Sequence, residues 1–234
     1  MVRAIQLKMK NVYYISFGFF FIAIGFIGSL LFELGLIFEE FFVTTGFIFV
    51  ALFTYHTFHK DRGSTPGLII LIILLLSVIH FILQIIFSFN PGVLLHLISK
   101  FFDIFKTFVI FFWLGVSSYR AYERIKNENV KDWIKMRYKL IAFSAFILSI
   151  QAVPELFMPY DVEYGDPQDF ITLILFTINI IIALIFSGCF FVSWIIPKSL
   201  KNYINRNYQE REFQDLNEIE IIKKVKNDLN KKET

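Results

Sequence analysis

The chain has 234 residues, of which 56% are hydrophobic and only 18% are charged, and its formal net charge at pH 7 is +3. A typical soluble domain is about 45–50% apolar and about 25% charged. Phenylalanine occurs 31 times, more often than a soluble fold of this size can bury. The composition excludes a disordered protein and a nucleic-acid-binding protein, and the single cysteine, Cys189, excludes an internal disulfide and Cys-rich zinc or iron–sulfur sites. The sequence therefore predicts an integral membrane protein.

Apolar segments long enough to cross a bilayer follow one another along the chain. A helix needs about 20 mostly apolar residues to cross about 30 Å of hydrocarbon. Six segments meet this requirement: Val12–Ile37, Phe41–Phe58, Gly67–Phe89, Leu94–Tyr119, Lys139–Met158 and Phe170–Ile196. Glycine, proline and asparagine separate most of them, whereas the break at Glu39–Glu40 is the weakest. We expect an all-α, polytopic membrane protein with a six-helix transmembrane bundle.

The basic residues predict the orientation of this bundle. All but two of the 23 Lys and Arg residues, Lys100 and Lys106, fall in the two terminal segments or in the second and fourth connections. The other three connections contain no Lys or Arg, and their charged residues are all acidic, namely Glu39, Glu40, Asp161, Glu163, Asp166 and Asp169. Because positively charged loops remain in the cytoplasm, we expect a multi-pass protein of the cell membrane with both termini cytoplasmic.

The fourth segment contains a polar face in a region that should be apolar. His96, Lys100, Asp103 and Lys106 recur at spacings of three and four, which places them on one side of a helix. A charge inside a bilayer costs about 2.5–3.5 kcal/mol even on insertion scales, so such residues usually mark function or a partner. We predict that Asp103 pairs with Lys100 or Lys106. The alternative is that the span begins near Phe101 and that both lysines reach outward to the interface.

Polar residues of other segments predict one common pocket. At about 1.5 Å of rise per residue, those of the third, fifth and sixth segments lie at similar heights in the outer half of the bundle. Pro154 lacks a backbone N–H and frees the carbonyl of Ile150, which favours a polar environment there. We expect Glu155 to be the acid left without a partner. The predicted ligand-binding residues are His80, Gln84, His96, Lys100, Asp103, Lys106, Gln151, Glu155 and Asn179. The alternative role for the neutral ones is hydrogen bonding between helices.

The sequence contains none of the catalytic or cofactor-binding motifs that were considered. The sequence has no phosphate-binding glycine loop, no Gly-x-Ser-x-Gly, no His-Glu-x-x-His and no Cys-x-x-Cys. His56 and His59 share one helix end beside Lys60, which disfavours a bis-histidine haem site. The acidic stretch Asp161–Asp169 lacks the spacing of a calcium loop. We therefore expect no catalytic residues, no metal and no cofactor.

The C-terminal segment differs in character from the rest, so we divide the chain into a transmembrane domain (1–197) and a basic, amphipathic cytoplasmic tail (198–234). Asn217 and Glu220 have the spacing of a helix capping box. The helix that follows would carry an apolar stripe, beside several lysines, formed by Ile219, Ile222, Val225 and Leu229. We expect this short helix to contact the lipid bilayer or a cytoplasmic protein partner. The oligomeric state is left open.

Three functions are compatible with this pattern. The favoured one is a non-catalytic small-molecule-binding or sensory module with an outward-facing polar pocket, similar in architecture alone to the multi-span input modules of microbial sensors. The second is a small-solute or proton-coupled transporter, which would need a polar path through the inner half as well. The third, a membrane-embedded enzyme acting on lipids, lacks a nucleophile–base pair or a metal constellation.

Overall fold

The computed structural model describes residues 10–60, 63–162, 168–194 and 198–206, and everything described in it is helix, turn or loop without a strand. The elements in chain order are α2 (Lys10–Phe32), α3 (Leu36–Thr54) with its π-helical continuation η1 (Tyr55–His59), α4 (Thr65–Phe89), α5 (Val93–Ile125), α6 (Asp132–Leu148), the 3₁₀ helix η2 (Val153–Phe157), α7 (Phe170–Trp194) and α8 (Lys198–Ile204). The predicted all-α class is confirmed. The predicted tail helix around Ile219–Leu229 lies outside the described residues.

Five segments of the described chain are helical, long and apolar enough to cross a membrane: Asn11–Ser29, Leu36–His59, Thr65–Phe89, Asp132–Phe157 and Phe170–Trp194. The helix α5 is the longest, at 33 residues, but its first half carries three of the charged residues discussed above. The prediction of a multi-pass helical membrane protein thus agrees with the fold in five of its six segments.

The pattern of exposed and buried residues on helix α4 indicates the environment of the protein surface. Leu68, Leu71 and Leu75 are each more than half exposed, whereas His80 and Gln84 are buried. A helix of a water-soluble protein has the opposite arrangement, with its apolar stripe inside. Hydrocarbon tolerates exposed leucines and penalises exposed polar groups, so this inverted pattern fits a lipid environment.

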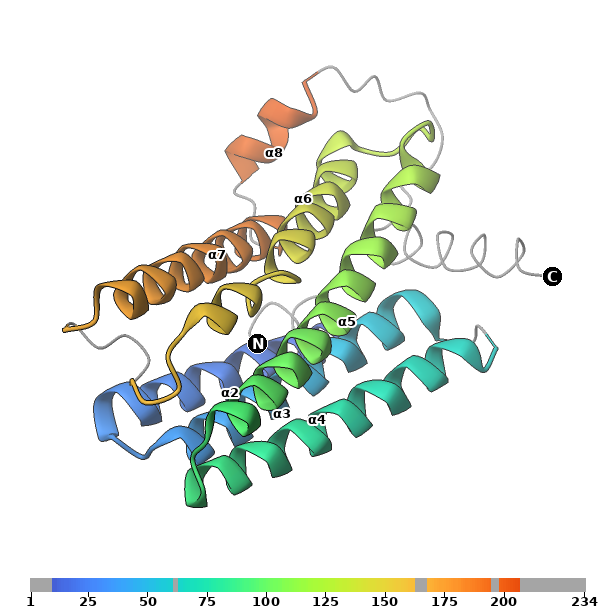
Figure 1. The fold of residues 1–234 in the computed structure, drawn as a ribbon. Coiled ribbons are helices and arrows are strands. Elements are labelled where there is room, and N and C mark those ends of the chain that lie inside the picture. Colours follow the sequence, from blue (N-terminus) through green and yellow to red (C-terminus); the bar gives the residue numbers. More distant parts are fainter. Residues whose placement is uncertain (1–9, 61–62, 163–167, 195–197, 207–234) are drawn as a thin grey trace.

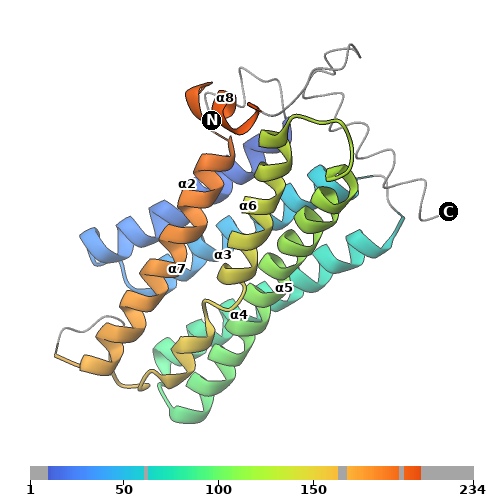
Figure 2. The same ribbon diagram turned by 90° about the horizontal axis from the view of Figure 1, so that it is seen from above.

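Helix α5 occupies the centre of the bundle and packs against α3, α4 and α6 (Figures 1 and 2). Consecutive helices contact each other from α2 through α7. The connections between α2 and α3 and between α4 and α5 lie at one end of the bundle, which we call the Gly35 end (Figure 1). Those between α3 and α4 and between α5 and α6 lie at the other, which we call the Asn127 end (Figure 1).

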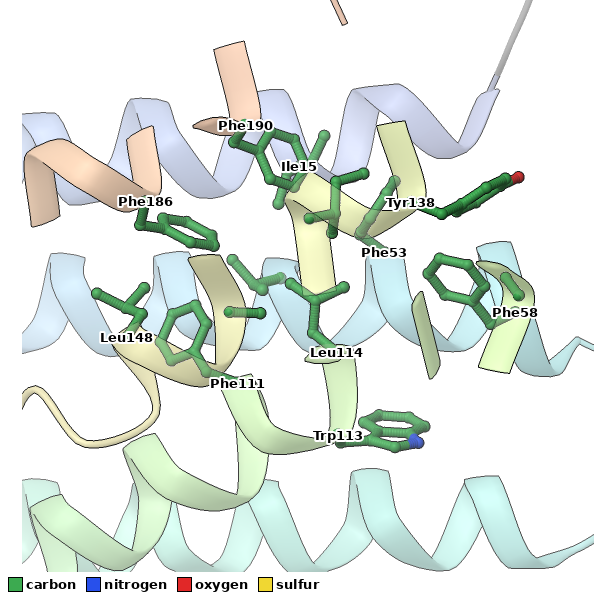
Figure 3. Packing of buried hydrophobic residues seen from close by; sticks show 14 of the residues in the cluster. Ile15, Phe53, Phe58, Phe111, Trp113, Leu114, Tyr138, Leu148, Phe186 and Phe190 are labelled. Atoms are coloured by element: carbon green, nitrogen blue, oxygen red, sulfur yellow. The ribbon is translucent and has the colours of Figure 1, made fainter. Parts of the chain in front are cut away.

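A tightly packed apolar layer fills the middle of the molecule (Figure 3). Its members, each 0–1% exposed, come from α3, α5 and α6 and are Val50, Phe53, Ile110, Phe111, Leu114 and Ile141. The rings of Phe186 and Phe190 from α7 extend this layer, with the Phe111 and Phe186 ring centroids 5.4 Å apart. Interiors of this kind are close-packed and leave few voids that could hold water.

Two predicted helix boundaries were wrong. Helix α3 begins at Leu36 rather than at Phe41, because the chain turns at Glu33 and Gly35, which adopt positive φ angles of 51° and 81°. Glu39 and Glu40 therefore lie inside a helix and not in a connection.

The fifth segment also differs from its predicted range of 139–158. Helix α6 begins at Asp132 and ends at Leu148, and the chain resumes as η2. Pro154 lies in this second piece, where the missing N–H breaks no α-helical bond. The Ile150 carbonyl, which was expected to be freed, accepts a hydrogen bond of 3.1 Å from the Val153 N–H.

The start of α7 is capped outside the apolar segment. Asp169 Oδ1 accepts a hydrogen bond of 2.7 Å from the Thr172 N–H, one of the N–H groups that a helix N-terminus leaves without an internal partner. This bond favours the ionised carboxylate and holds the pKa of Asp169 below its ordinary value.

Glycines allow α2 and α3 to approach closely. A Cβ atom at Gly46 would lie 2.7 Å from the backbone oxygen of Gly18, and one at Gly25 would lie 3.0 Å from that of Glu39. Both glycines therefore pack within the chain, and the bulk of a side chain would force the two backbones apart.

We predict that Gly46→Ala lowers the free energy of unfolding by about 1–3 kcal/mol, because the methyl group overpacks this contact. The matched control is Gly188→Ala, where a Cβ atom meets nothing within 4 Å. Thermal unfolding in detergent should show a loss for the first variant and none for the second. Equal stability of the two variants would contradict the tight contact.

Candidate functional site

A buried lysine lies at the centre of the polar residues. The Lys106 side chain is 0% exposed, and its ammonium is surrounded by groups from three helices. Nζ lies 2.9 Å from Glu40 Oε1 and 3.1 Å from Thr44 Oγ1 on α3, 3.0 Å from Asp103 Oδ1 on α5, and 2.9 Å from His80 Nδ1 on α4. Two carboxylates thus neutralise the ammonium within hydrogen-bonding distance.

The histidine bridges the acid on α3 and the amide on its own helix. His80 is fully buried, with Nδ1 2.8 Å from Glu40 Oε1 and Nε2 3.2 Å from Gln84 Nε2. The Thr44 hydroxyl donates a 2.5 Å hydrogen bond to the same oxygen of Glu40. Asp103 Oδ1 lies farther from the ring, at 3.7 Å from Nδ1. Glu40 therefore accepts from several donors at once.

A second ion pair lies nearer the start of α5. Lys100 Nζ donates to Glu155 Oε2 at 2.5 Å, and the Asn179 amide donates to Glu155 Oε1 at 3.0 Å. These contacts join α5 to η2 and α7. The ion network, as we use the term, comprises Glu40, His80, Lys100, Asp103, Lys106 and Glu155, and it lies toward the Gly35 end of the bundle.

Three side chains of the network resemble a metal-binding group, but the ammonium of Lys106 already lies among them. Glu40, His80 and Asp103 offer atoms that lie within 4.8 Å of one another. The Lys106 ammonium is within 3.0 Å of all three. A divalent ion would have to share this space with a fixed positive charge, so the group is an ion-pair network and not a metal centre.

The predicted pair of Asp103 with Lys106 is confirmed, and Lys106 is buried instead of reaching toward an interface. The expectation that Glu155 has no partner was wrong, because the break after α6 returns this residue to Lys100. The structure also brings together His80 with Gln84, and Asn179 with Glu155.

Two predicted residues lie outside these contacts. His96 is buried with its ring 5.6 Å from that of Phe87, and its Nε2 has no hydrogen-bond partner within the described part of the chain. Gln151 is half-buried in the turn after α6, where its backbone N–H donates to the Leu148 carbonyl.

Two residues of this site, Glu40 and Thr44, were not predicted from the sequence. Glu40 was assigned to a loop, although no glycine or proline lies at the supposed break between Phe38 and Phe41. Its spacing of four from Thr44 is the signal that could have revealed a helix there, since residues at i and i+4 share a face.

The Asn127 end is held by aromatic side chains and cations. Arg137 is 3% exposed, and its guanidinium lies 4.5 Å from the ring of Trp133 and 4.7 Å from that of Trp194. Lys201 Nζ of α8 lies 4.0 Å from the centroid of the Trp133 ring. The backbone N–H of Trp133 donates a hydrogen bond to Asn205 Oδ1. We use the name Arg137 cluster for Arg137, Trp133, Trp194 and Lys201.

A small cavity of about 20 Å³ lies beside this cluster, lined in part by Phe53, Thr57 and Trp194. This volume is enough for about one water molecule. The apolar layer lies between this cavity and the ion network. The Arg137 cluster and the ion network are therefore separate polar regions.

No protein-family model, curated protein sequence or solved structure matches this chain. The geometry of the site is therefore the basis on which a function is proposed.

We predict that Lys106→Met lowers the free energy of unfolding by about 3–5 kcal/mol, because two buried carboxylates lose their counter-charge. Adding Glu40→Gln and Asp103→Asn should recover most of this loss. The measurement is thermal unfolding in detergent, with Lys126→Met, whose side chain is 40% exposed, as the control expected to behave like the wild type. A Lys106→Met protein as stable as this control would contradict a buried network.

Proposed function

We propose that this protein is a non-catalytic sensory module of the membrane, which binds its ligand at the ion network and passes the signal to a separate cytoplasmic protein. The observation that carries this proposal is the position of the network. It joins four helical elements at the Gly35 end and is separated from the Asn127 end by the apolar layer. A site that is closed on one side suits the detection of a ligand better than its transport across the membrane.

The apolar layer argues against the transporter alternative. Alternating access needs a binding site near the midplane with polar groups toward both sides. On α5, Ile110, Phe111 and Leu114 lie one to two turns beyond Lys106 and are 0–1% exposed. On α3, Val50 and Phe53 follow Thr44 in the same way. An ion leaving the network toward the Asn127 end would have to cross this close-packed region.

Two segments of the chain connect the network to the Arg137 cluster. Helix α6 carries Arg137 and continues through the turn into η2 with Glu155. Helix α7 carries Asn179 near its middle and Trp194 at its end. A change in the Glu155 contacts would therefore shift the two helices that hold the Arg137 cluster. Helix α8, at the start of the C-terminal tail, is attached to the same cluster through Lys201.

We further propose that α5 is the sixth span. Its 33 residues extend over about 50 Å, more than the hydrocarbon thickness. Its charged residues are paired inside the bundle, which offsets part of the cost of burying them. With six spans, the distribution of Lys and Arg favours a cell-membrane protein with the Gly35 end outside and both termini cytoplasmic.

The topology predicts which cysteines a membrane-impermeant maleimide reaches in intact cells. Cysteines replacing Leu34 and Asn90 should be labelled from outside, whereas those replacing Ser64 and Asn127 should be labelled only after lysis, since each wild-type side chain is exposed. The background is Cys189→Ser. External labelling of the Asn127 position would contradict the orientation.

If the protein is a sensor, the purified protein should not transport protons across a membrane, with or without exchange for Na⁺ or K⁺. Proteoliposomes holding a pH-sensitive dye should report the same decay of an imposed pH gradient as empty liposomes, with Na⁺ or K⁺ outside. An added protonophore is the positive control. A faster decay that Glu40→Gln abolishes would favour the transporter and contradict the proposal.

A further inference from the structure

We propose that the ligand of the ion network is a proton, which His80 takes up at Nε2. This inference rests on the sensory function proposed above and names what that site detects. It follows from the hydrogen-bond donors around the ring and from the charge of the network.

The contacts of Lys106 and Glu40 favour hydrogen on one of the two ring nitrogens. An ammonium has three N–H donors, and Glu40, Asp103 and Thr44 each offer an oxygen within 3.1 Å. With these three bonds made, His80 Nδ1 satisfies Glu40 by donating to it over 2.8 Å. The remaining nitrogen, Nε2, then accepts from the Gln84 amide over 3.2 Å. The neutral ring with hydrogen on Nδ1 thus satisfies the contacts with Glu40 and Gln84, although its N–H then lies 2.9 Å from the Lys106 ammonium, which is also a donor. In this tautomer only Nε2 has a lone pair for an incoming proton.

The charges facing the ring favour that proton. Glu40 from α3 and Asp103 from α5 contribute two negative charges, and Lys106 contributes one positive charge. The neighbouring Lys100 and Glu155 cancel each other. With His80 neutral, the network has a net charge of −1, and with His80 protonated it has none. The half-buried Glu39, next to Glu40 on α3, adds to the negative side. A buried net charge is costly, so neutralisation supplies a driving force for proton uptake.

Gln84 allows the ring to change state without moving. Its side-chain amide has a donor nitrogen and an acceptor oxygen on the same carbon. When Nε2 becomes an N–H, rotation of this amide by half a turn presents Oε1 as the acceptor. The balance is simple: one proton enters, one N–H bond forms, and one hydrogen bond reverses direction.

The exposure of the network suits a ligand of this size. Lys106 and His80 are fully buried, whereas the side chains of Glu40, Asp103 and Glu155 are 13–18% exposed. These three carboxylates are the members of the network that the protein does not fully enclose, so we expect protons to reach the ring through them. A larger cation would have to displace one of two lysines.

The test is a histidine-labelled ¹⁵N NMR titration of the full chain in lipid nanodiscs from pH 9 to pH 5, since histidine ordinarily titrates near pH 6.5. The His80 signals are assigned by their loss in His80→Gln. We expect the resonance of the unprotonated Nε2 to be present at pH 9 and lost by pH 5, while Nδ1 stays protonated throughout. Persistence of that resonance at pH 5, or its absence at pH 9, would overturn the proposal.

Two variants test the charge argument. Asp103→Asn removes the net negative charge, so the protonated fraction of His80 should fall several-fold at pH 6. Asp161→Asn, at an exposed acid outside the network, is the matched control and should titrate like the wild type. Should Asp103→Asn fail to fold, Gln84→Glu provides an acceptor-only partner and should raise the protonated fraction at the same pH. Titration identical to the wild type in the folded variants would overturn the proposal.

Tryptophan fluorescence separates this inference from the sensory function. The background is Trp113→Phe, because the Trp113 ring stacks on His59 at 5.2 Å and would report that histidine instead. A change in Trp133 and Trp194 emission that follows the His80 titration, and that His80→Gln removes, supports both proposals. If His80 titrates and the emission stays constant, the proton site stands and the sensory function fails. An emission change that survives in His80→Gln overturns the assignment of the ligand.

Discussion

The structure depends on one constraint, the need to surround a charged lysine in an apolar bundle. An isolated ammonium in such an interior costs several kcal/mol or loses its proton. Lys106 is fully buried and is compensated by Glu40 from α3 and Asp103 from its own helix. For Glu40 to reach this position, α3 must begin before it, and the sharp turn at Gly35 makes that possible. The junction of α3, α4 and α5 thus follows from a single charge.

The two ends of the bundle are stabilised by different physical interactions. At the Gly35 end, ion pairs and hydrogen bonds join the helices, and their strength depends on protonation. At the Asn127 end, the Arg137 guanidinium lies between two indole rings, a contact that changes little with pH because arginine keeps its proton. The apolar layer between them keeps water from the buried side of the network. Under the proposed function, the Gly35 end would respond to its surroundings and the Asn127 end would transmit the change.

Local geometry explains which features were predictable from the sequence. Composition and segment length predicted a helical membrane protein because every residue contributes to them. Asp103 and Lys106 lie one turn apart on the same helix, so their pairing needed no knowledge of other helices. The partners of Glu40 and Glu155 were missed because they depend on how separate helices pack, and both residues lie next to helix breaks whose positions were predicted wrongly. The tail residues Ile219, Ile222, Val225 and Leu229 stay a prediction, since they lie outside the described residues.

The charge of the network is the property that favours the proposed responsive site over a purely structural one. Buried ion pairs are weak evidence for stability, because apolar residues of similar volume often stabilise as well or better. A purely structural network would be expected to balance its charges with the histidine neutral, yet two carboxylates face one lysine around His80. The group that completes the ring's contacts, Gln84, can serve either protonation state. A leucine would have packed in this position, but it could not hydrogen-bond to the ring in either state, whereas the amide lets the same fold hold the histidine with or without the proton.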